Sequence, residues 1–306
     1  MIDILLATYN GEKYVRSQLD SILNQTEKNF RILIRDDGST DNTIQILREY
    51  ESKYSNIQII KDDRPSRGAA ANFFELMKHT DAEYVMFCDQ DDYWLPNKIE
   101  VSMRAMTNAE EKYAKGCPML IYTAYKPVDE DLHDIPMKNS NNMVYKHFDQ
   151  INRLLIQNYI TGCTMMINKA LCDIAAVDYE PSILMHDWWV ALCASAMGHI
   201  SYVNEVTMKY RQHQSQSVGA IDVKSFSYRL KKFKNPETKN MDKKCVRQAQ
   251  CLLKHYGKKL SPEMRKEVAL FANIENYSKI RRINILLHGK YLKSDLVRVI
   301  GQLIYV

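Results

Sequence analysis

The segment Tyr-Val-Met-Phe-Cys-Asp-Gln-Asp-Asp-Tyr-Trp, residues 84–94, decides the fold that we predict for this chain. Its first five residues are an apolar run typical of a buried strand, and the run ends at Asp89-Gln90-Asp91-Asp92. Similar runs occur earlier in the chain, at residues 2–6, 30–34 and 57–60. Apolar residues at helical spacing lie between them, at 15–23, 44–50 and 69–77. This alternation indicates an α/β fold with a mostly parallel, Rossmann-like sheet covered by helices on both faces.

Polar and acidic residues follow three of these predicted strands. Thr8-Tyr9 ends the first strand, Asp36-Asp37 the second, and Asp89 and Asp91 follow the run at 84–88. Ligands of such sheets bind at the carboxyl ends of the strands, so these side chains should converge on one rim. Paired carboxylates there can share Mg²⁺ or Mn²⁺, which would offset the charge of a phosphate ligand. A lone D-x-D is usually an acidic surface turn, but the convergence favours a metal-dependent site.

The remainder of the chain is less regular. We expect strands at 119–125, 159–168 and 200–210, a loop or lid at 129–142, and a helix at 184–197 that begins near His186-Asp187-Trp188-Trp189. The Asp-Gly-Ser-Thr stretch at 37–40 is also ordinary turn and cap chemistry. The glycine-rich loops of dinucleotide oxidoreductases and P-loop enzymes are absent, which disfavours both classes.

Charge divides the chain into two parts. Residues 224–306 hold 20 of the 42 Lys and Arg residues and 6 of the 37 Asp and Glu residues. That segment therefore carries a net charge of +14, and residues 1–223 carry −9, within a total of +5. Apolar residues at helical spacing accompany the basic ones, so the segment is either an amphipathic surface for an anionic membrane, or a helical appendage packed on the first part, or a dimer contact. It has no recognised nucleic-acid motif, and we expect no nucleic-acid partner.

The seven cysteines are odd in number, and no two have C-x-x-C spacing. This pattern argues against a zinc site and against a disulfide framework. The N-terminus runs directly into a predicted strand, and no run of 18 apolar residues occurs. We therefore expect a reduced, cytoplasmic protein without a signal peptide or a membrane-spanning helix.

Several short motifs occur in a defined order over roughly residues 1–220. They are Ala7-Thr8-Tyr9-Asn10-Gly11, Ser21-Ile22-Leu23-Asn24-Gln25-Thr26, the stretch from Asp36 to Thr43, Asp89-Gln90-Asp91-Asp92-Tyr93-Trp94 with Lys98, Thr161-Gly162-Cys163-Thr164-Met165, His186-Asp187-Trp188-Trp189, and Tyr210-Arg211-Gln212-His213. The ordered set resembles family 2 glycosyltransferases of the GT-A fold. Within them it resembles the rhamnosyltransferase-like enzymes of bacterial cell-surface polysaccharide synthesis.

The resemblance implies an inverting transfer from a nucleotide-diphosphate sugar, dTDP-L-rhamnose or a UDP-hexose, to a saccharide or lipid-linked saccharide hydroxyl. Asp187 would be the general base, and Asp91 and His213 would hold Mg²⁺ or Mn²⁺ with the diphosphate. Gly162 and Trp188 would face the acceptor, although buried Trp residues are more often core. The implied donor-binding residues are Ala7, Thr8, Tyr9, Asp37, Asp89 and Gln90. Tyr9 would lie beside the nucleobase, Asp37 would hydrogen-bond the nucleobase, and Asp89 would contact the ribose.

The resemblance also sets the expected domains, with residues 1–220 forming the catalytic domain and residues 221–306 a basic, mainly helical extension. Two positions depart from the family pattern: His186 stands where Glu is frequent, and His213 is followed by Gln214-Ser215-Gln216-Ser217. A sugar nucleotidyltransferase and a nucleotide-binding scaffold are the alternatives. A sugar nucleotidyltransferase would need a glycine-rich N-terminal loop, which this chain lacks. The presence of Asp91 and Asp187 argues against a nucleotide-binding scaffold.

Overall fold

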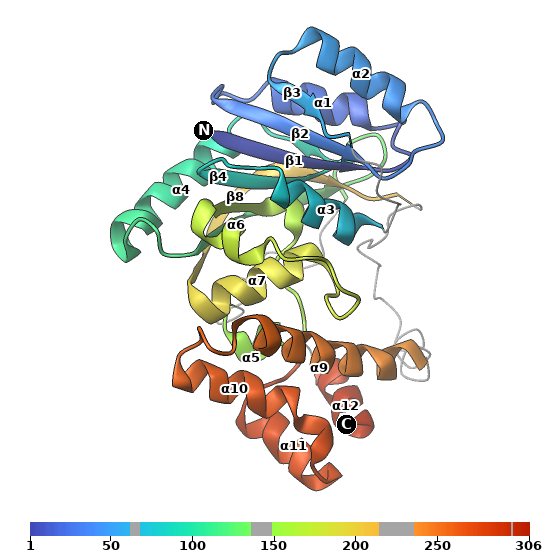
Figure 1. Cartoon of the computed structure of the whole chain (residues 1–306). Coiled ribbons are helices and arrows are strands. Elements are labelled where there is room, and N and C mark those ends of the chain that lie inside the picture. Colours follow the sequence, from blue (N-terminus) through green and yellow to red (C-terminus); the bar gives the residue numbers. More distant parts are fainter. Residues whose placement is uncertain (62–67, 136–148, 214–235, 295) are drawn as a thin grey trace.

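The computed structural model describes residues 1–61, 68–135, 149–213, 236–294 and 296–306 (Figure 1). An eight-stranded sheet with the order β3-β2-β1-β4-β7-β6-β8-β5 forms the centre of the described chain. The strands are β1 (Ile2–Thr8), β2 (Phe30–Asp36), β3 (Ile57–Ile59), β4 (Tyr84–Asp89), β5 (Tyr93–Trp94), β6 (Met119–Val128), β7 (Met165–Asn168) and β8 (His199–Arg211). Strands β1 to β4 are parallel, and so are β6 and β8, whereas β7 runs antiparallel to both of its neighbours.

Helices cover both faces of the sheet because β1 alternates its apolar side chains between two cores. Ile2, Ile4 and Leu6 pack in one core with α1 (Val15–Leu23), α2 (Thr43–Lys53) and α4 (Lys98–Tyr113). Leu5 and Ala7 face the other core, which contains α3 (Ala69–Lys78), α5 (Ile151–Leu154), α6 (Lys169–Ala175) and α7 (His186–Met197). Period-two alternation with both sets apolar is expected of a parallel strand that is buried on both faces.

The register of the strands brings the polar strand ends together. Thr8 pairs with Asp36 across β1 and β2, and Ala7 pairs with Asp89 across β1 and β4. The three strands therefore end within one residue of each other along the same rim. The convergence expected from the sequence is present in the structure.

One predicted strand is shorter in the structure, one predicted loop is only partly described, and one helix was not predicted. The strand expected at 159–168 begins only at Met165, because a 3₁₀ turn, η1 (Gly162–Thr164), precedes it. Residues 129–135 form a turn with one bridge, Val128 to Asp134, and the remainder of the expected loop lies outside the described residues. Helix α4 was not predicted, although Asn97 and then Ile99, Met106 and Ala109 at helical spacing give it a sequence signal.

The described part of the basic segment, residues 236–294 and 296–306, is mainly helical. It contains α9 (Pro236–Tyr256), α10 (Pro262–Ala272), η2 (Ile274–Asn276), α11 (Lys279–His288) and α12 (Leu296–Tyr305). Apolar side chains of α9 and α10 belong to the same core as α7, on its side away from the sheet (Figure 1). The expected boundary at 220/221 lies outside the described residues, and the first described helix beyond it is packed on the α/β part.

Hydrogen bonds reinforce this packing. The Gln248 side chain accepts from the Leu184 backbone N–H at 2.8 Å, and Asn152 and Arg153 donate to the carbonyls of Gly289 and Leu292, both at 2.8 Å. None of the helices described here is long and apolar enough to span a bilayer.

Candidate active site

The end of β1 is fixed to the end of β4 by one side-chain amide. Gln90 accepts from the Tyr9 N–H and donates to the Tyr9 carbonyl, both at 2.9 Å. Gly11 passes so close to this amide that a Cβ there would lie 2.2 Å from Gln90 Oε1. Gln90 thus orders the loop that carries Tyr9, and the Tyr9 ring is left more than half exposed at the rim. This exposed ring is in keeping with the expected stacking on a base.

The turn after β2 is organised by Asp36. Its carboxylate accepts from the Thr8 hydroxyl at 2.7 Å, from the Ser39 hydroxyl at 2.6 Å, and from the N–H groups of Gly38 and Ser39. Gly38 has φ +87°, in the region that favours glycine. Thr8 is therefore buried and faces this turn, so its hydroxyl supports the loop that would receive a donor.

Asp37 lies deeper than its neighbours. Its carboxylate contacts the Arg35 guanidinium at 3.3 Å and accepts from the Gly68 N–H at 2.9 Å. Arg35 in turn donates to Asn72 on α3 at 3.2 Å. This buried network holds Asp37 at the floor of the rim, between the end of β2 and the beginning of α3.

Asp91 pairs with the histidine expected beside it. His213 Nε2 lies 2.8 Å from Asp91 Oδ2, and both side chains are largely buried. Arg211 aligns the two segments, because its N–H donates to Asp92 at 3.1 Å and its Nε donates to the Asp91 carbonyl at 2.7 Å. The Tyr14 ring packs against His213, with ring centroids 4.9 Å apart. The acidic turn after β4 and the end of β8 thus form one unit.

The spacing of Asp91 and His213 is that of their direct hydrogen bond, 2.8 Å. A carboxylate oxygen and an imidazole nitrogen are both ligands of divalent metals, and a cation held by this pair would have to replace that bond. Burial, and then repulsion from Asp91 and Asp187, raise the pKa of Asp89 to about 7. A cation on the rim would relieve that repulsion.

A second acidic group lies behind the rim. Atoms of Asp89, Asp92 and Cys163 approach within 4.8 Å of one another, but Asp92 and Cys163 are fully buried. The Lys98 ammonium lies in the same interior, 3.4 Å from the Thr207 hydroxyl, and burial lowers its pKa to about 8. Asp92 and Lys98 are therefore best explained as internal support for the acidic turn, and a donor diphosphate would meet Asp89 and Asp91 first.

Asp187 stands in the first turn of α7 and is partly buried. Its carboxylate accepts from the Gly162 N–H at 3.2 Å and from the Trp188 N–H at 2.6 Å. Burial raises its pKa to about 6 even though these bonds favour the ionised form. Gly162, its backbone partner, is followed by Cys163, whose sulfur lies within 4.8 Å of the Asp89 carboxylate. The structure thus places Asp187 at the rim. Sequence alone could not show that Asp187 faces there.

His186 and Gly162 fix the position of Asp187. His186 is buried and stacks on the Phe73 ring at 3.9 Å between centroids, and burial lowers the pKa of the imidazole to about 3. A Cβ on Gly162 would lie 2.7 Å from His186 Nε2. The neutral imidazole therefore packs directly under the loop that donates to Asp187.

Trp188 does not present its ring to the rim. It is buried in the core, and its indole N–H donates to the Leu154 carbonyl at 2.5 Å. Trp188 is therefore a core residue, and its ring does not lie where it could contact an acceptor.

Comparison with known proteins shows the family of this chain. The family model described as glycosyl transferase family 2 matches residues 3–174, so the chain belongs to this family. Over 229 residues it is 33% identical to a dTDP-rhamnosyl transferase of Shigella flexneri, covering 70% of this chain and 74% of that protein. It is also 27% identical over 218 residues to an uncharacterized glycosyltransferase of Rickettsia typhi, covering 71% and 65%.

Solved structures show the fold. The chain resembles S. aureus TarS 1–349 in complex with UDP-GlcNAc, with a TM-score of 0.56 and 15% identity over 99% of this chain and 90% of that one. It also resembles a mannosyltransferase from Pyrobaculum calidifontis in complex with GDP-Man and Mn²⁺, with a TM-score of 0.52 and 14% identity over 94% and 72%. The GT-A fold implied by the sequence resemblance is confirmed, and the chain is a family 2 glycosyltransferase.

The contact between Gly162 and His186 gives a first prediction. Gly162→Ala should lower kcat for sugar transfer by about 10²-fold, because it would displace Asp187, the expected base, and a displacement of an ångström is enough for such a loss. Steady-state kinetics beside circular dichroism would separate this effect from unfolding. A folded Gly162→Ala variant with unchanged kcat would show that Asp187 does not depend on this packing.

Proposed function

We propose that this glycosyltransferase performs a metal-dependent, inverting transfer in cell-surface polysaccharide synthesis, with Asp187 as the base. The observation that carries the proposal is that Asp187 and the acidic turn meet at η1, where Gly162 donates to Asp187 and the adjacent Cys163 lies within 4.8 Å of the Asp89 carboxylate. Donor-phosphate ligands and a base are thereby on one rim. Neither a nucleotide-binding scaffold nor a sugar nucleotidyltransferase needs a general base beside the acidic turn, where Asp187 lies.

Asp91 and His213 would hold the cation, Mg²⁺ or Mn²⁺. When bound, it would offset the negative charge that builds up on the departing diphosphate. Tyr9 would stack on the nucleobase of the donor, and Asp37 at the floor of the rim would hydrogen-bond the same nucleobase. Asp89 would accept a hydrogen bond from the ribose. Ala7, Thr8 and Gln90 would shape this pocket, since Gln90 and Thr8 order its two loops.

The donor we propose is dTDP-L-rhamnose, supported by the 33% identity to a protein named as a dTDP-rhamnosyl transferase. In the transfer step the Asp187 carboxylate takes the proton from an acceptor hydroxyl as the oxygen attacks the anomeric carbon. The carbon–oxygen bond to the diphosphate breaks on the opposite side. The transition state has oxocarbenium character, and the configuration is inverted.

Nucleotide release with water as a slow acceptor tests the donor. Release of dTDP from dTDP-L-rhamnose should exceed release of UDP from UDP-glucose and of GDP from GDP-mannose at equal concentrations. Faster turnover of UDP-glucose would replace the proposed donor with a UDP-hexose. No turnover of any donor with metal and membrane-derived acceptor present would contradict the proposed activity.

Asp187→Asn should reduce turnover by about 10²–10⁴-fold, the usual contribution of a positioned base, while donor affinity is kept. In the wild-type enzyme turnover should fall as pH decreases through about 6, because Asp187 then gains a proton and no longer accepts one. Asp187→Asn should lose this pH dependence. Normal turnover in the variant would remove Asp187 as the base.

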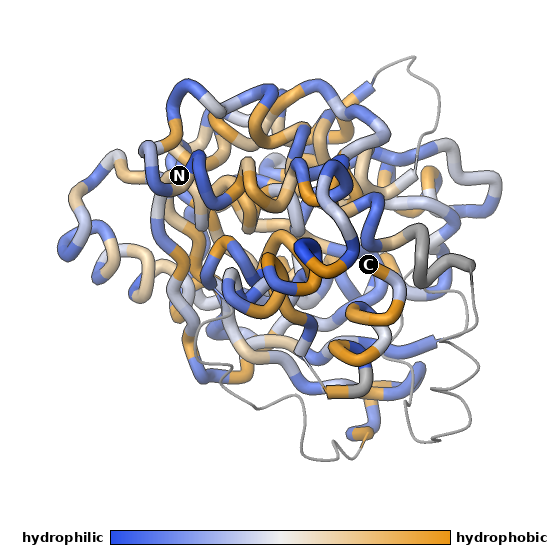
Figure 2. Tube along the Cα trace, turned by 90° about the horizontal axis from the view of Figure 1, so that it is seen from below, coloured by the Kyte–Doolittle hydropathy of each residue, from blue (hydrophilic) through white to orange (hydrophobic). Residues whose placement is uncertain are grey.

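The acceptor we propose is lipid-linked, and we propose that α11 and α12 attach the protein to an anionic membrane surface on the cytoplasmic side. Among the described residues, five of the nine large apolar side chains that are exposed lie on these two helices. Leu296, Ile300 and Ile304 repeat every four residues along α12 and are 74%, 48% and 55% exposed. The view of this end in Figure 2 shows apolar turns beside the C-terminus.

The charge around this face selects the partner. Residues 279–306 contain six Lys and Arg residues and a single acidic residue, Asp295. Gln302, on the opposite side of α12, is buried and donates to the Tyr291 carbonyl at 2.8 Å, so the helix is anchored with its apolar stripe outward. Lys279 joins the two helices by donating to the Ile304 carbonyl at 2.8 Å. An apolar stripe among basic side chains suits anionic lipid.

Vesicle flotation tests this attachment. The wild-type chain should bind vesicles that contain phosphatidylglycerol more tightly than pure phosphatidylcholine, and salt should weaken the binding. The double variant Ile300→Glu, Ile304→Glu should bind at least about tenfold more weakly, since each buried Ile contributes roughly 1.5–3 kcal/mol. Tyr54→Glu, an exposed residue just beyond the end of α2, is the matched control and should bind normally.

Two results would contradict the attachment. One is equal flotation of the wild-type chain and the double variant. The other is a concentration-dependent dimer, measured by light scattering, that the double variant abolishes, because a second copy would then cover the face.

A further inference from the structure

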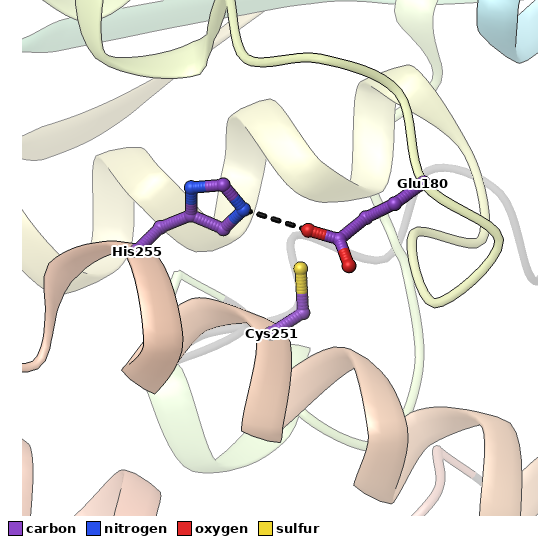
Figure 3. Close-up of side chains that lie close together, drawn as sticks. All are labelled: Glu180, Cys251 and His255. Carbon is purple, nitrogen blue, oxygen red and sulfur yellow. Dashed lines mark hydrogen bonds and ion pairs between the residues drawn. The ribbon is translucent and has the colours of Figure 1, made fainter.

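A second cluster of metal-binding side chains lies at the junction of the extension with the catalytic domain. Cys251 and His255 are four residues apart on α9 and therefore share one face of the helix. Glu180 faces them from the segment between α6 and α7. The three side chains point toward one another (Figure 3), and their ligand atoms all lie within 4.8 Å of one another.

The atoms of this cluster are those that zinc prefers. A thiolate, an imidazole nitrogen and a carboxylate oxygen are its usual protein ligands, and three of them leave a fourth position for water. Zinc ligands in a tetrahedron are about 3.2–3.6 Å apart, so the observed spread closes with shifts of roughly 1 Å. His255 Nε2 is already 2.8 Å from Glu180 Oε1.

An ion-pair network is the competing explanation. Lys254 donates to both oxygens of Glu180, at 3.1 and 3.2 Å, and Ser182 donates to one at 3.2 Å. The hydrogen bond with His255, and then those from Lys254, Cys251 and Ser182, lower the pKa of Glu180 to about 2. Yet Lys254 is 67% exposed, and an exposed pair of this type contributes little to stability. Lys254 can therefore turn to water without leaving a buried charge.

Cys251 takes part in the network, because its thiol hydrogen-bonds Glu180. A network of charged groups does not require a buried sulfur at this place, however, and cysteine sulfur is a usual ligand of zinc. The Trp189 ring packs edge-on to His255 at 5.9 Å between centroids and shields one side of the cluster. A shielded thiol beside an imidazole and a carboxylate is an environment in which zinc binding releases the thiol proton.

We propose that Glu180, Cys251 and His255 bind a zinc ion that ties α9 to the segment leading into α7. Since Asp187 is in the first turn of α7, the ion would stabilise the approach to the catalytic base without touching substrate. The cysteine spacing argued against zinc because no two cysteines have C-x-x-C spacing. The C-x-x-x-H spacing of α9, with a carboxylate from a distant loop, is outside that pattern.

Cobalt substitution of the full chain tests the site independently of catalysis. After treatment with a chelator, titration with Co²⁺ should give the near-ultraviolet absorption of one cobalt–thiolate site, apart from any Co²⁺ held without a thiolate at Asp91 and His213, and Zn²⁺ should abolish the absorption. Zn²⁺ should also raise the Tm of the stripped protein. Cys251→Ser should abolish the absorption, whereas Cys117→Ser and Asp91→Ala should keep it.

His255→Asn provides a second variant in case Cys251→Ser does not fold, and it should weaken Co²⁺ binding at least tenfold. Absence of a cobalt–thiolate absorption in the folded wild-type chain would overturn the proposal. So would an absorption that survives Cys251→Ser or that is lost in Asp91→Ala, because the ion would then lie at the acidic rim.

Discussion

Repulsion among carboxylates at the rim of the sheet is the constraint on which the site depends. Burial and then the charges of Asp91 and Asp187 raise the pKa of Asp89, and burial and then the charges of Asp91 and Asp89 raise the pKa of Asp92. Backbone donation from Arg211 and the interior ammonium of Lys98 hold this arrangement together. The strands that end at this rim exist in parallel register because their apolar residues fill two cores.

The elements that meet at the rim are joined by polar side chains. Gln90 links β4 to the loop after β1, Asp36 links β2 to β1, and Arg211 links β8 to the acidic turn. The rim is consequently a composite of four strand ends and one helix N-terminus. A nucleotide would bind to groups that are already ordered, and such ordering lowers the entropic cost of binding.

The sequence was sufficient for the parallel part of the fold, because residues 2–6, 30–34 and 84–88 are buried on both faces and have no other stable placement. It also predicted the convergence of Thr8, Asp36 and Asp89, which follows from strand direction alone. The place of Asp187 could not be derived in this way, because it depends on how α7 crosses β4. Burial of Trp188 against Leu154 and the meeting of Glu180 with Cys251 likewise depend on packing between distant segments.

The central claim is that the carboxylate rim accepts a diphosphate only together with a divalent cation. Calorimetric titration of dTDP into the wild-type chain tests it directly, once with Mn²⁺ and once with EDTA. The account predicts binding with Mn²⁺ and a loss of at least about tenfold in affinity with EDTA, since like charges would then face each other unscreened. Equal affinity under the two conditions would contradict it, because the acidic rim would then not be where the diphosphate binds.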